Sequence, residues 1–363
     1  MSRSYPIEPS EVTAAWIDTQ LHKCGAITTS KVTSIASEPL GEGVGMMALL
    51  SRITVNYDDP EAGAPATVVA KFAIQNENRV VGMAFHVYER EALFLRDLAG
   101  LSGVPLPAVY AVEIDIASGD NVILMEDIGD YRMGDQVEGC DLETAKIILD
   151  AIAPVHAAFW QNVDQPILSF VPRVDGEMQT DAMSAGPAAG WDPCVERFPD
   201  TMTPLVRVHR DKFLNSTREL HARMGRLPQT LCHGDCRLDN MMFAKEPGHH
   251  PVIVLDWQGV IISSGLQDVG YLLTQNLSVE NRRMGERDLV AHYHSRLVEH
   301  GVTGYTLEQC WEDYRLAALY LFVYALVIGG TLDPSNDRGR AFMSSLLTRA
   351  TATIEDLDLF SLL

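Results

Sequence analysis

The sequence predicts an α+β fold built in two parts, and three observations support this prediction. Runs rich in Val, Ile and Thr are concentrated in the first third of the chain. Helical periodicity of apolar residues dominates the remainder. A chain of 363 residues is long enough to bury two cores. We therefore expect a sheet-containing part at residues 1–127 and a mainly helical part at residues 128–363.

The first part is expected to contain a leading helix, five strands and one internal helix. Turns signalled by Gly, Pro and Asp separate the strand-like runs. The elements in chain order are an amphipathic helix at 9–24, strands at 32–40, 46–57 and 67–74, a helix at 83–98, and strands at 109–116 and 122–125. Together they predict a five-stranded antiparallel sheet with one helix.

The second part is expected to be mainly helical. The elements that periodicity supports are a helix at 142–159 capped by Asp141, a helix at 206–224, short strands near 240–243 and 252–255, and helices after residue 266. Residues 161–204 are rich in Pro, Gly and Asp and give no clear pattern. The most apolar stretch, 316–328, is too short to span a bilayer and is interpreted as a buried helix.

Composition excludes several function classes. The chain has 28 Lys and Arg against 49 Asp and Glu, a formal net charge of −21, so nucleic acids and anionic membranes should repel it. Six cysteines in a chain of this length do not indicate a disulfide framework, and we expect them to be reduced. Residues 1–20 contain no apolar leader segment. We therefore expect a cytoplasmic protein with no nucleic-acid or membrane partner.

The polar residues that best indicate chemistry lie between 231 and 258. Asp235 and Asn240 are five residues apart in a predicted turn that leads into a short strand, and Asp256 ends the next strand. Phosphoryl transfer needs a carboxylate that orients or deprotonates the attacking hydroxyl, together with oxygen ligands for Mg²⁺. The spacing therefore favours phosphoryl transfer. The alternative is that Asp235 caps a turn and that Asp256 only ends a strand.

Two motifs carry a family resemblance, HGDCRLDN at 233–240 and DWQ at 256–258. They resemble the catalytic and metal loops of the protein-kinase-like phosphotransferases, and within them the aminoglycoside/choline kinase branch. The residues of these motifs are most similar to those of the ecdysteroid-kinase-like family and of the kinase-like domains of some acyl-CoA dehydrogenases. PVHAAFW at 154–160 and WEDYR at 311–315 are also typical of that branch. The resemblance spans residues 40–330 and implies a two-lobed protein-kinase-like fold whose interlobe cleft holds MgATP.

The resemblance implies a role for each matching residue of these loops. Asp235 would act as the catalytic base or hydroxyl-orienting carboxylate, and Asn240 and Asp256 would hold Mg²⁺. His233 would brace the loop.

Two charged neighbours have a less specific interpretation. Arg237 either reaches the γ-phosphate or the acceptor, or pairs with Asp239 or Asp268. Asp268 is expected to be a helix N-cap outside the site.

Lys71 is the expected phosphate-binding residue of the first part. It ends the strand-like run VVAK at 68–71 and matches the third-strand lysine that contacts ATP phosphates in the resembled fold. Its partner should be a glutamate on the following helix. Glu89 and Glu91 point in different directions on that helix, so only one of them can contact Lys71. Glu91 better matches the sequence motif of the resembled family.

Two further segments are expected to contact nucleotide. Gly41, Gly43 and Gly45 would cover the phosphates, because glycine allows close approach of backbone N–H groups, although such a segment is often only a hairpin turn. The run LMEDIG at 124–129 resembles the interlobe hinge. The adenine edge would bond to backbone groups near Glu126 and Ile128.

The expected function is an ATP-dependent phosphotransferase that moves the γ-phosphoryl of MgATP to a hydroxyl of a small molecule. The alternatives are a nucleotide-binding module without catalysis, a kinase with a protein acceptor, and a scaffold whose motifs are coincidental. Acidic charge suits a cationic acceptor, whereas the family resemblance favours a bulkier, less polar alcohol. Residues 161–230, with Trp160, Trp191 and Phe198, are expected to contribute to the acceptor site.

Overall fold

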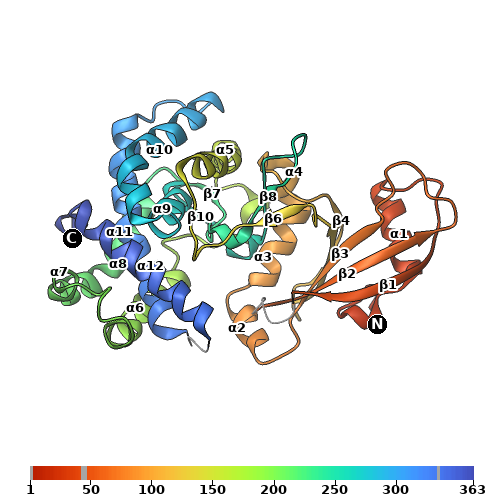
Figure 1. Ribbon diagram of the computed structural model, residues 1–363, viewed down its shortest axis with the longest axis horizontal. Coiled ribbons are helices and arrows are strands. Elements are labelled where there is room, and N and C mark those ends of the chain that lie inside the picture. The colour runs from red at the N-terminus through yellow and green to blue at the C-terminus, as the bar shows by residue number, and fades with distance from the viewer. Residues whose placement is uncertain (1–2, 42–46, 333–335) are drawn as a thin grey trace. The chain divides into compact units, whose positions relative to one another are not determined.

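The computed structural model describes residues 3–41, 47–332 and 336–363 (Figure 1). Backbone contacts divide the chain into two compact units. The sheet unit comprises residues 1–100, 106–131 and 256–259, and the helical unit comprises residues 101–105, 132–255 and 260–363. The predicted boundary at residue 127 assigned residues 256–259 to the helical part. Their contacts are instead with the sheet unit, because Trp257 stacks on Phe94 there.

The predicted five-stranded antiparallel sheet is confirmed. Its strands lie in the order β1-β2-β3-β5-β4, and all neighbours are antiparallel. The bounds are β1 Val32–Leu40, β2 Ala48–Tyr57, β3 Thr67–Ala73, β4 Val109–Asp115 and β5 Asp120–Glu126. This order places β3, which carries Lys71, at the centre of the sheet.

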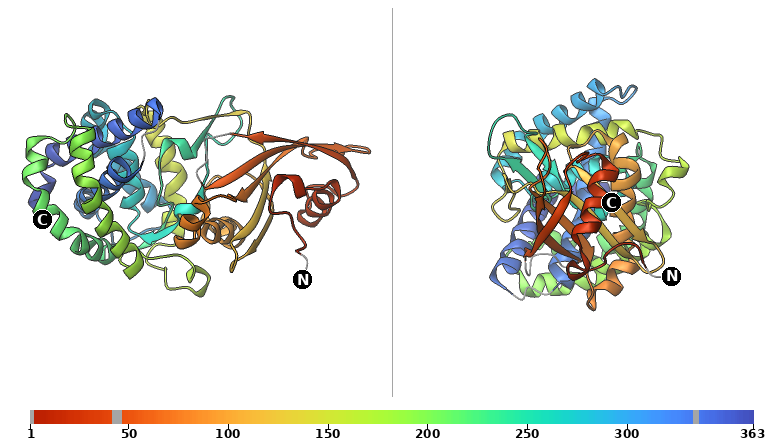
Figure 2. Two further views of the ribbon diagram at one scale, coloured as in Figure 1. Left: turned by 90° about the horizontal axis from the view of Figure 1, so that it is seen from below. Right: turned by 90° about the vertical axis from the view of Figure 1, so that its right-hand side faces the viewer.

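Helix α1 (Ala14–Cys24) covers one face of this sheet (Figure 2). Alternate residues of β3, among them Val68 and Phe72, lie in one core cluster with Ile17 and Leu21 of α1. Successive side chains of a strand point to opposite faces. The side chain of Lys71 is therefore directed to the face that α1 does not cover.

The helix expected at residues 83–98 is interrupted. The chain forms α2 (Asn78–Ala84), α3 (Val87–Leu93), a π-helical segment η2 (Phe94–Leu98) and α4 (Ala99–Ser102). His86 separates α2 from α3, and its φ of 54° lies in the left-handed region. The apolar pattern is helical on both sides of His86, which is why periodicity did not reveal the break.

The helical unit is built mainly from long helices. Its elements are β6 Tyr131–Met133 (shared with the sheet unit), α5 Leu142–Ala158, α6 Glu177–Arg197, α7 Pro204–Val208, α8 Arg210–Arg226, β7 Thr230–Cys232, β8 Met241–Ala244, β9 Val252–Val254, β10 Ile261–Ser263, α9 Leu266–Gln275, α10 Val279–Glu299, α11 Leu307–Thr331 and α12 Asp337–Asp356. Asp141 caps α5 as predicted, since its carboxylate accepts from the Thr144 N–H at 2.8 Å. The helix expected at 206–224 is divided at His209.

Helix α11 forms the core of this unit, as expected for the apolar stretch 316–328. By length and composition it could cross a membrane, but most of its side chains are buried inside the protein. Core helices inside globular proteins can be equally long and apolar, and the burial of α11 is typical of such helices.

Helix α6 occupies part of the segment 161–204, in which no clear pattern was found, and it packs closely on α11. A Cβ at Gly190 would lie 2.3 Å from the carbonyl oxygen of Leu326, so only glycine allows this approach. Trp191 and Phe198 are buried in the core. Trp191 packs against Phe213 and Phe322, so the expected role of these two aromatic residues in an acceptor site is wrong.

Candidate active site

Lys71 is the centre of a buried ion-paired group in the sheet unit. Its ammonium donates to Glu91 Oε1 on α3 at 2.7 Å and to Asp256 Oδ1 at 3.0 Å. Burial disfavours the ammonium, but the carboxylates of Asp256 and Glu91 outweigh it and raise the pKa of Lys71 above its ordinary value. Glu89, the alternative partner, instead contacts the imidazole of His86 at 3.0 Å. The side chain of Lys71 is therefore held in its protonated, positively charged form.

Asp256 is held in an uncommon backbone conformation. Its φ of 62° lies in the left-handed region, which side-chain-bearing residues rarely adopt. The next residue, Trp257, stacks on Phe94 with ring centroids 3.8 Å apart and planes 8° apart. Strained backbone of this kind persists when surrounding contacts determine it, and it is concentrated at functional sites. Here the Lys71 ion pair and the Trp257 stack provide those contacts.

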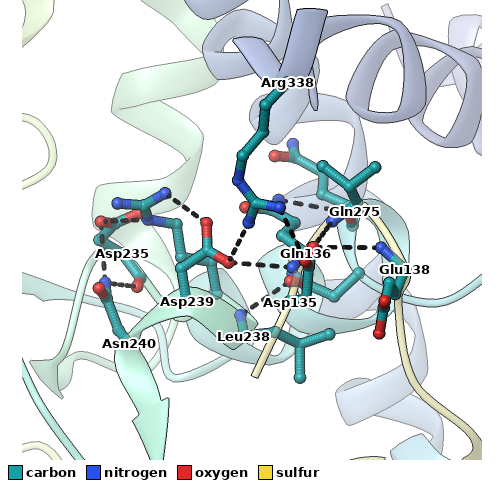
Figure 3. A network of polar contacts seen from close by, with 12 residues as sticks. Asp135, Gln136, Glu138, Asp235, Leu238, Asp239, Asn240, Gln275 and Arg338 are labelled. Carbon is teal, nitrogen blue, oxygen red and sulfur yellow. Dashed lines mark hydrogen bonds and ion pairs between the residues drawn. The ribbon is translucent and has the colours of Figure 1, made fainter. Parts of the chain in front are cut away.

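Asp235 and Asn240 lie on one loop of the helical unit (Figure 3). The Asn240 amide donates to Asp235 Oδ2 at 3.0 Å and to the Asp235 carbonyl oxygen at 2.9 Å. Arg237 Nε donates to the same Oδ2 at 3.1 Å. Among the described residues, no donor lies within hydrogen-bond distance of Asp235 Oδ1. One carboxylate oxygen is thus used to orient Asp235, and the other is available to a ligand.

Arg237 also links this loop to the rest of the helical unit. Its Nη1 donates to Asp239 Oδ2 at 3.2 Å, so one guanidinium joins Asp235 and Asp239. Asp239 Oδ1 accepts from the Gln136 N–H at 3.0 Å and lies 3.8 Å from Arg338 Nη2 at the start of α12 (Figure 3). The structure therefore gives Arg237 one of the pairings that were left open, the one with Asp239.

Asp268 is a site residue that sequence reasoning placed wrongly. It is not an N-cap but lies inside α9, fully buried. Its carboxylate accepts from the N–H groups of His233 at 2.6 Å and Gly234 at 2.9 Å, and from His156 Nε2 at 3.1 Å. Burial opposes the charge, but these donors, His156 first, hold the pKa of Asp268 below its usual range. An acidic residue directly before the mainly apolar run 269–273 was the signal that could have revealed this buried, partnered carboxylate.

His156, Cys232 and Asp268 form a buried cluster whose ligand atoms lie within 4.8 Å of one another. Burial raises the pKa of the Cys232 thiol well above its ordinary value, whereas metal binding needs the thiolate. The thiol donates to the Ser264 carbonyl at 3.3 Å, and His156 Nδ1 lies 2.9 Å from the Tyr293 hydroxyl. The cluster is therefore a hydrogen-bonded support for the loop.

His233 connects the loop to the strand that precedes Asp256. Its Nε2 lies 2.8 Å from the Leu255 carbonyl oxygen, and its Nδ1 accepts from the Asp235 N–H at 3.2 Å. The Leu255 N–H in turn donates to the Asn240 carbonyl at 2.9 Å. These contacts fit the bracing role expected for His233.

The expected hinge follows β5. The Glu126 N–H donates to the Ala108 carbonyl at 2.8 Å, and its carboxylate accepts from the Ala108 N–H at 3.0 Å. The Ile128 carbonyl accepts from the Tyr131 N–H at 3.0 Å. Within the described part of the chain, no protein acceptor faces the Ile128 N–H. This donor is available to a ligand.

Arg52 of β2 supports the same segment and was not expected from the sequence. Its Nε and Nη2 donate to the two carboxylate oxygens of Asp127 at 2.7 and 3.1 Å. Burial opposes the Asp127 carboxylate, but the Arg52 hydrogen bonds outweigh it and lower the pKa of Asp127. Of the expected phosphate-covering glycines, Gly41 directly follows β1 and has a φ of 69°, whereas Gly43 and Gly45 lie outside the described residues.

A family model described as the ecdysteroid kinase-like family matches residues 42–302. The chain belongs to the ecdysteroid kinase-like family. Among the relatives of this family member, an uncharacterized kinase-like protein of Caenorhabditis elegans is 24% identical over 238 residues, which cover 62% of this chain and 61% of the nematode protein. The match thus spans less than two thirds of that relative.

Solved structures share the fold of this ecdysteroid kinase-like protein. A choline kinase from Cryptosporidium parvum aligns with a TM-score of 0.58 at 9% identity, covering 95% of this chain and 97% of the choline kinase. The GDP and kanamycin complex of the aminoglycoside phosphotransferase APH(2″)-IIIa aligns with a TM-score of 0.51 at 16% identity, covering 96% and 98%. These similarities confirm the predicted two-lobed kinase-like fold.

Proposed function

We propose that this protein transfers the γ-phosphoryl group of ATP to a hydroxyl of a small molecule in the presence of Mg²⁺. The observation that carries the proposal is the geometry of Asp235. Asn240 and Arg237 both hold Oδ2, which leaves Oδ1 to accept the hydrogen bond of an attacking hydroxyl. A carboxylate in this arrangement orients the hydroxyl and takes its proton as the oxygen–phosphorus bond forms and the bond to ADP breaks.

The nucleotide side of the proposal rests on the sheet unit. Lys71 is positively charged because Glu91 and Asp256 stabilise its ammonium, and a fixed cation of this kind binds phosphate oxygens. The N–H of Ile128, which has no acceptor among the described residues, would donate to the adenine edge. Arg52 stabilises this segment through its paired hydrogen bonds to Asp127.

Asn240 and Asp256 are the residues that would hold Mg²⁺. The Asn240 amide nitrogen donates to Asp235, which directs the amide oxygen away from that bond. Among the described residues no donor reaches this oxygen, so it could act as a ligand. An amide oxygen and a carboxylate are donors that Mg²⁺ prefers. When bound, the ion supplies positive charge that neutralises the phosphates.

A small-molecule acceptor is supported by the structural relatives. One is described as a choline kinase and another as a complex with kanamycin, and the latter also contains GDP. We therefore propose a hydroxyl-bearing small molecule as acceptor, and we include GTP beside ATP as a candidate donor in the test.

Calorimetric titration of ATP and of GTP, with and without Mg²⁺, tests the donor site. Saturable binding that requires Mg²⁺ and weakens in Asp256→Asn is expected, while Asp164→Asn, the same change at an exposed carboxylate, should bind as wild type. A screen of hydroxylated small molecules for nucleoside diphosphate release then tests the reaction. Binding without turnover would indicate a nucleotide-binding module, and label transferred to protein would indicate a protein acceptor. Absence of nucleotide binding would contradict the proposal.

A further inference from the structure

Gln258, the third residue of the DWQ segment, contacts a residue that already binds Lys71. Its side-chain amide donates to Glu91 Oε2 at 3.3 Å. The other oxygen of the same carboxylate, Oε1, accepts from Lys71 at 2.7 Å. Lys71 also donates to Asp256, which lies two residues before Gln258. Lys71, Glu91, Gln258 and Asp256 therefore form a closed ring, completed by the backbone between 256 and 258.

The ring satisfies a carboxylate that is almost fully buried. Glu91 is 3% exposed, and a buried carboxylate is costly unless donors reach both of its oxygens. Burial raises the pKa of Glu91, and Lys71 and Gln258 are the donors that oppose this shift. Among the described residues, Lys71 donates to one oxygen of Glu91 and Gln258 donates to the other.

A second contact joins the same tripeptide to the same helical segment. Trp257 stacks on Phe94, three residues after Glu91, and residues three apart lie on one face of a helix. Helix α3 and the following segment η2 therefore contact Trp257 and Gln258 at adjacent positions. These contacts explain why residues 256–259 belong to the sheet unit, although β9 belongs to the helical unit.

We propose that Gln258 is a positioning residue of the phosphotransfer site, which orients Glu91 and, through Lys71, the carboxylate of Asp256. This inference rests on the function proposed above. A neutral amide is required at position 258, because a carboxylate there would face the carboxylate of Glu91 and repel it. An apolar side chain would leave Glu91 Oε2 without its donor.

Four variants test the ring: Gln258→Leu, Gln258→Glu, Glu91→Gln, and the exchanged pair Glu91→Gln/Gln258→Glu. We expect Gln258→Leu to lower kcat/KM for MgATP by about 10- to 100-fold, the loss that corresponds to one hydrogen bond to a charged group. The KM for the acceptor should not change, because the ring lies on the nucleotide side. If Gln258→Leu impaired the use of MgATP and of the acceptor equally, the positioning role would be overturned.

The exchanged pair gives the sharper result. Gln258→Glu should be less active than Gln258→Leu, because its carboxylate would face that of Glu91. Adding Glu91→Gln removes this repulsion and should raise the activity of Gln258→Glu to about that of Glu91→Gln alone, in which Lys71 lacks the same carboxylate. Activities that multiply as independent losses would overturn the ring. The control is Gln75→Glu, which introduces the same negative charge at an exposed position of the sheet unit and should behave as wild type.

The same four proteins also distinguish this inference from the proposed function. In urea unfolding without nucleotide, the free energies of unfolding of these proteins should be non-additive between positions 91 and 258. This coupling should have the same sign as the coupling in activity, whether or not any phosphotransfer occurs. Coupled unfolding together with absent nucleotide binding in wild type would support the ring and contradict the function. Additive unfolding in a protein that binds MgATP would overturn the ring and leave the function standing.

Discussion

Replacement of Asp268 by Asn should loosen the loop that carries Asp235. Asp268 Oδ2 accepts from His156 and His233, and Oδ1 accepts from Gly234. The asparagine oxygen can keep the two contacts of Oδ2, but its amide nitrogen then faces the N–H of Gly234. One charge-assisted hydrogen bond is lost, about 1.5–3 kcal/mol, and one buried donor is left unpaired, about 1–3 kcal/mol. We therefore expect a destabilisation of about 2.5–6 kcal/mol, which includes the range found when a buried charge pair is broken.

Urea unfolding and hydrogen exchange measure this effect at two levels. The free energy of unfolding should fall by the stated amount, and the amide of Gly234 should exchange faster than in wild type. The matched control is Asp164→Asn, which makes the same chemical change at an exposed side chain and should alter stability by less than about 0.5 kcal/mol. If Asp268→Asn unfolds like this control and the exchange at residues 233–235 is unchanged, the proposed support of the loop by Asp268 is refuted.

Three further changes test other parts of the molecule. Asp235→Asn should fold and bind nucleotide but lose about two to four orders of magnitude in kcat, because general-base catalysis contributes roughly that factor; a variant with most of the wild-type rate would remove Asp235 from the role of base. Gly190→Ala should destabilise the helical unit by about 1–3 kcal/mol in thermal unfolding, since the new Cβ would lie 2.3 Å from a carbonyl of α11, whereas Gly100→Ala, where nothing lies within 4 Å, should be neutral or stabilising. Burial lowers the pKa of His221, so the unfolded chain takes up this proton first as pH falls. Its contribution to stability is complete above about pH 6.5 and is lost below it, and His221→Gln should flatten the decrease in unfolding free energy from pH 6.5 to 5; equal slopes would contradict this.

Much of the nucleotide side could be read from local patterns. Runs rich in Val, Ile and Thr predicted the five strands, and the resemblance of Lys71 to the third-strand lysine of the kinase-like fold implied a glutamate partner on the next helix. Helix geometry showed that Glu89 and Glu91 cannot both face Lys71, because residues two apart point in different directions. The structure places Glu91 there at 2.7 Å.

Other features depend on contacts between distant parts of the chain. Asp268 had the sequence context of an N-cap, but its donors are 34, 35 and 112 residues away. Gln258 reaches Glu91 across 167 residues. No local pattern encodes such pairings, because periodicity describes only which face of an element is apolar. Helix α6 was not predicted for the same reason. Its Pro and Gly residues disfavour an isolated helix, but they allow its backbone to approach α11.

The sequence by itself determined the order of the chemical groups along the chain: the lysine strand, the HGDCRLDN loop and the DWQ segment. It determined them because spacing within a turn or strand is a local property that residue types reveal directly. Only the tertiary structure decided how those groups are held. Asp235 uses one oxygen for Asn240 and Arg237, Glu91 divides its oxygens between Lys71 and Gln258, and Asp268 bonds the backbone of the loop. Buried polar groups must each find a partner, and packing decides which partner that is.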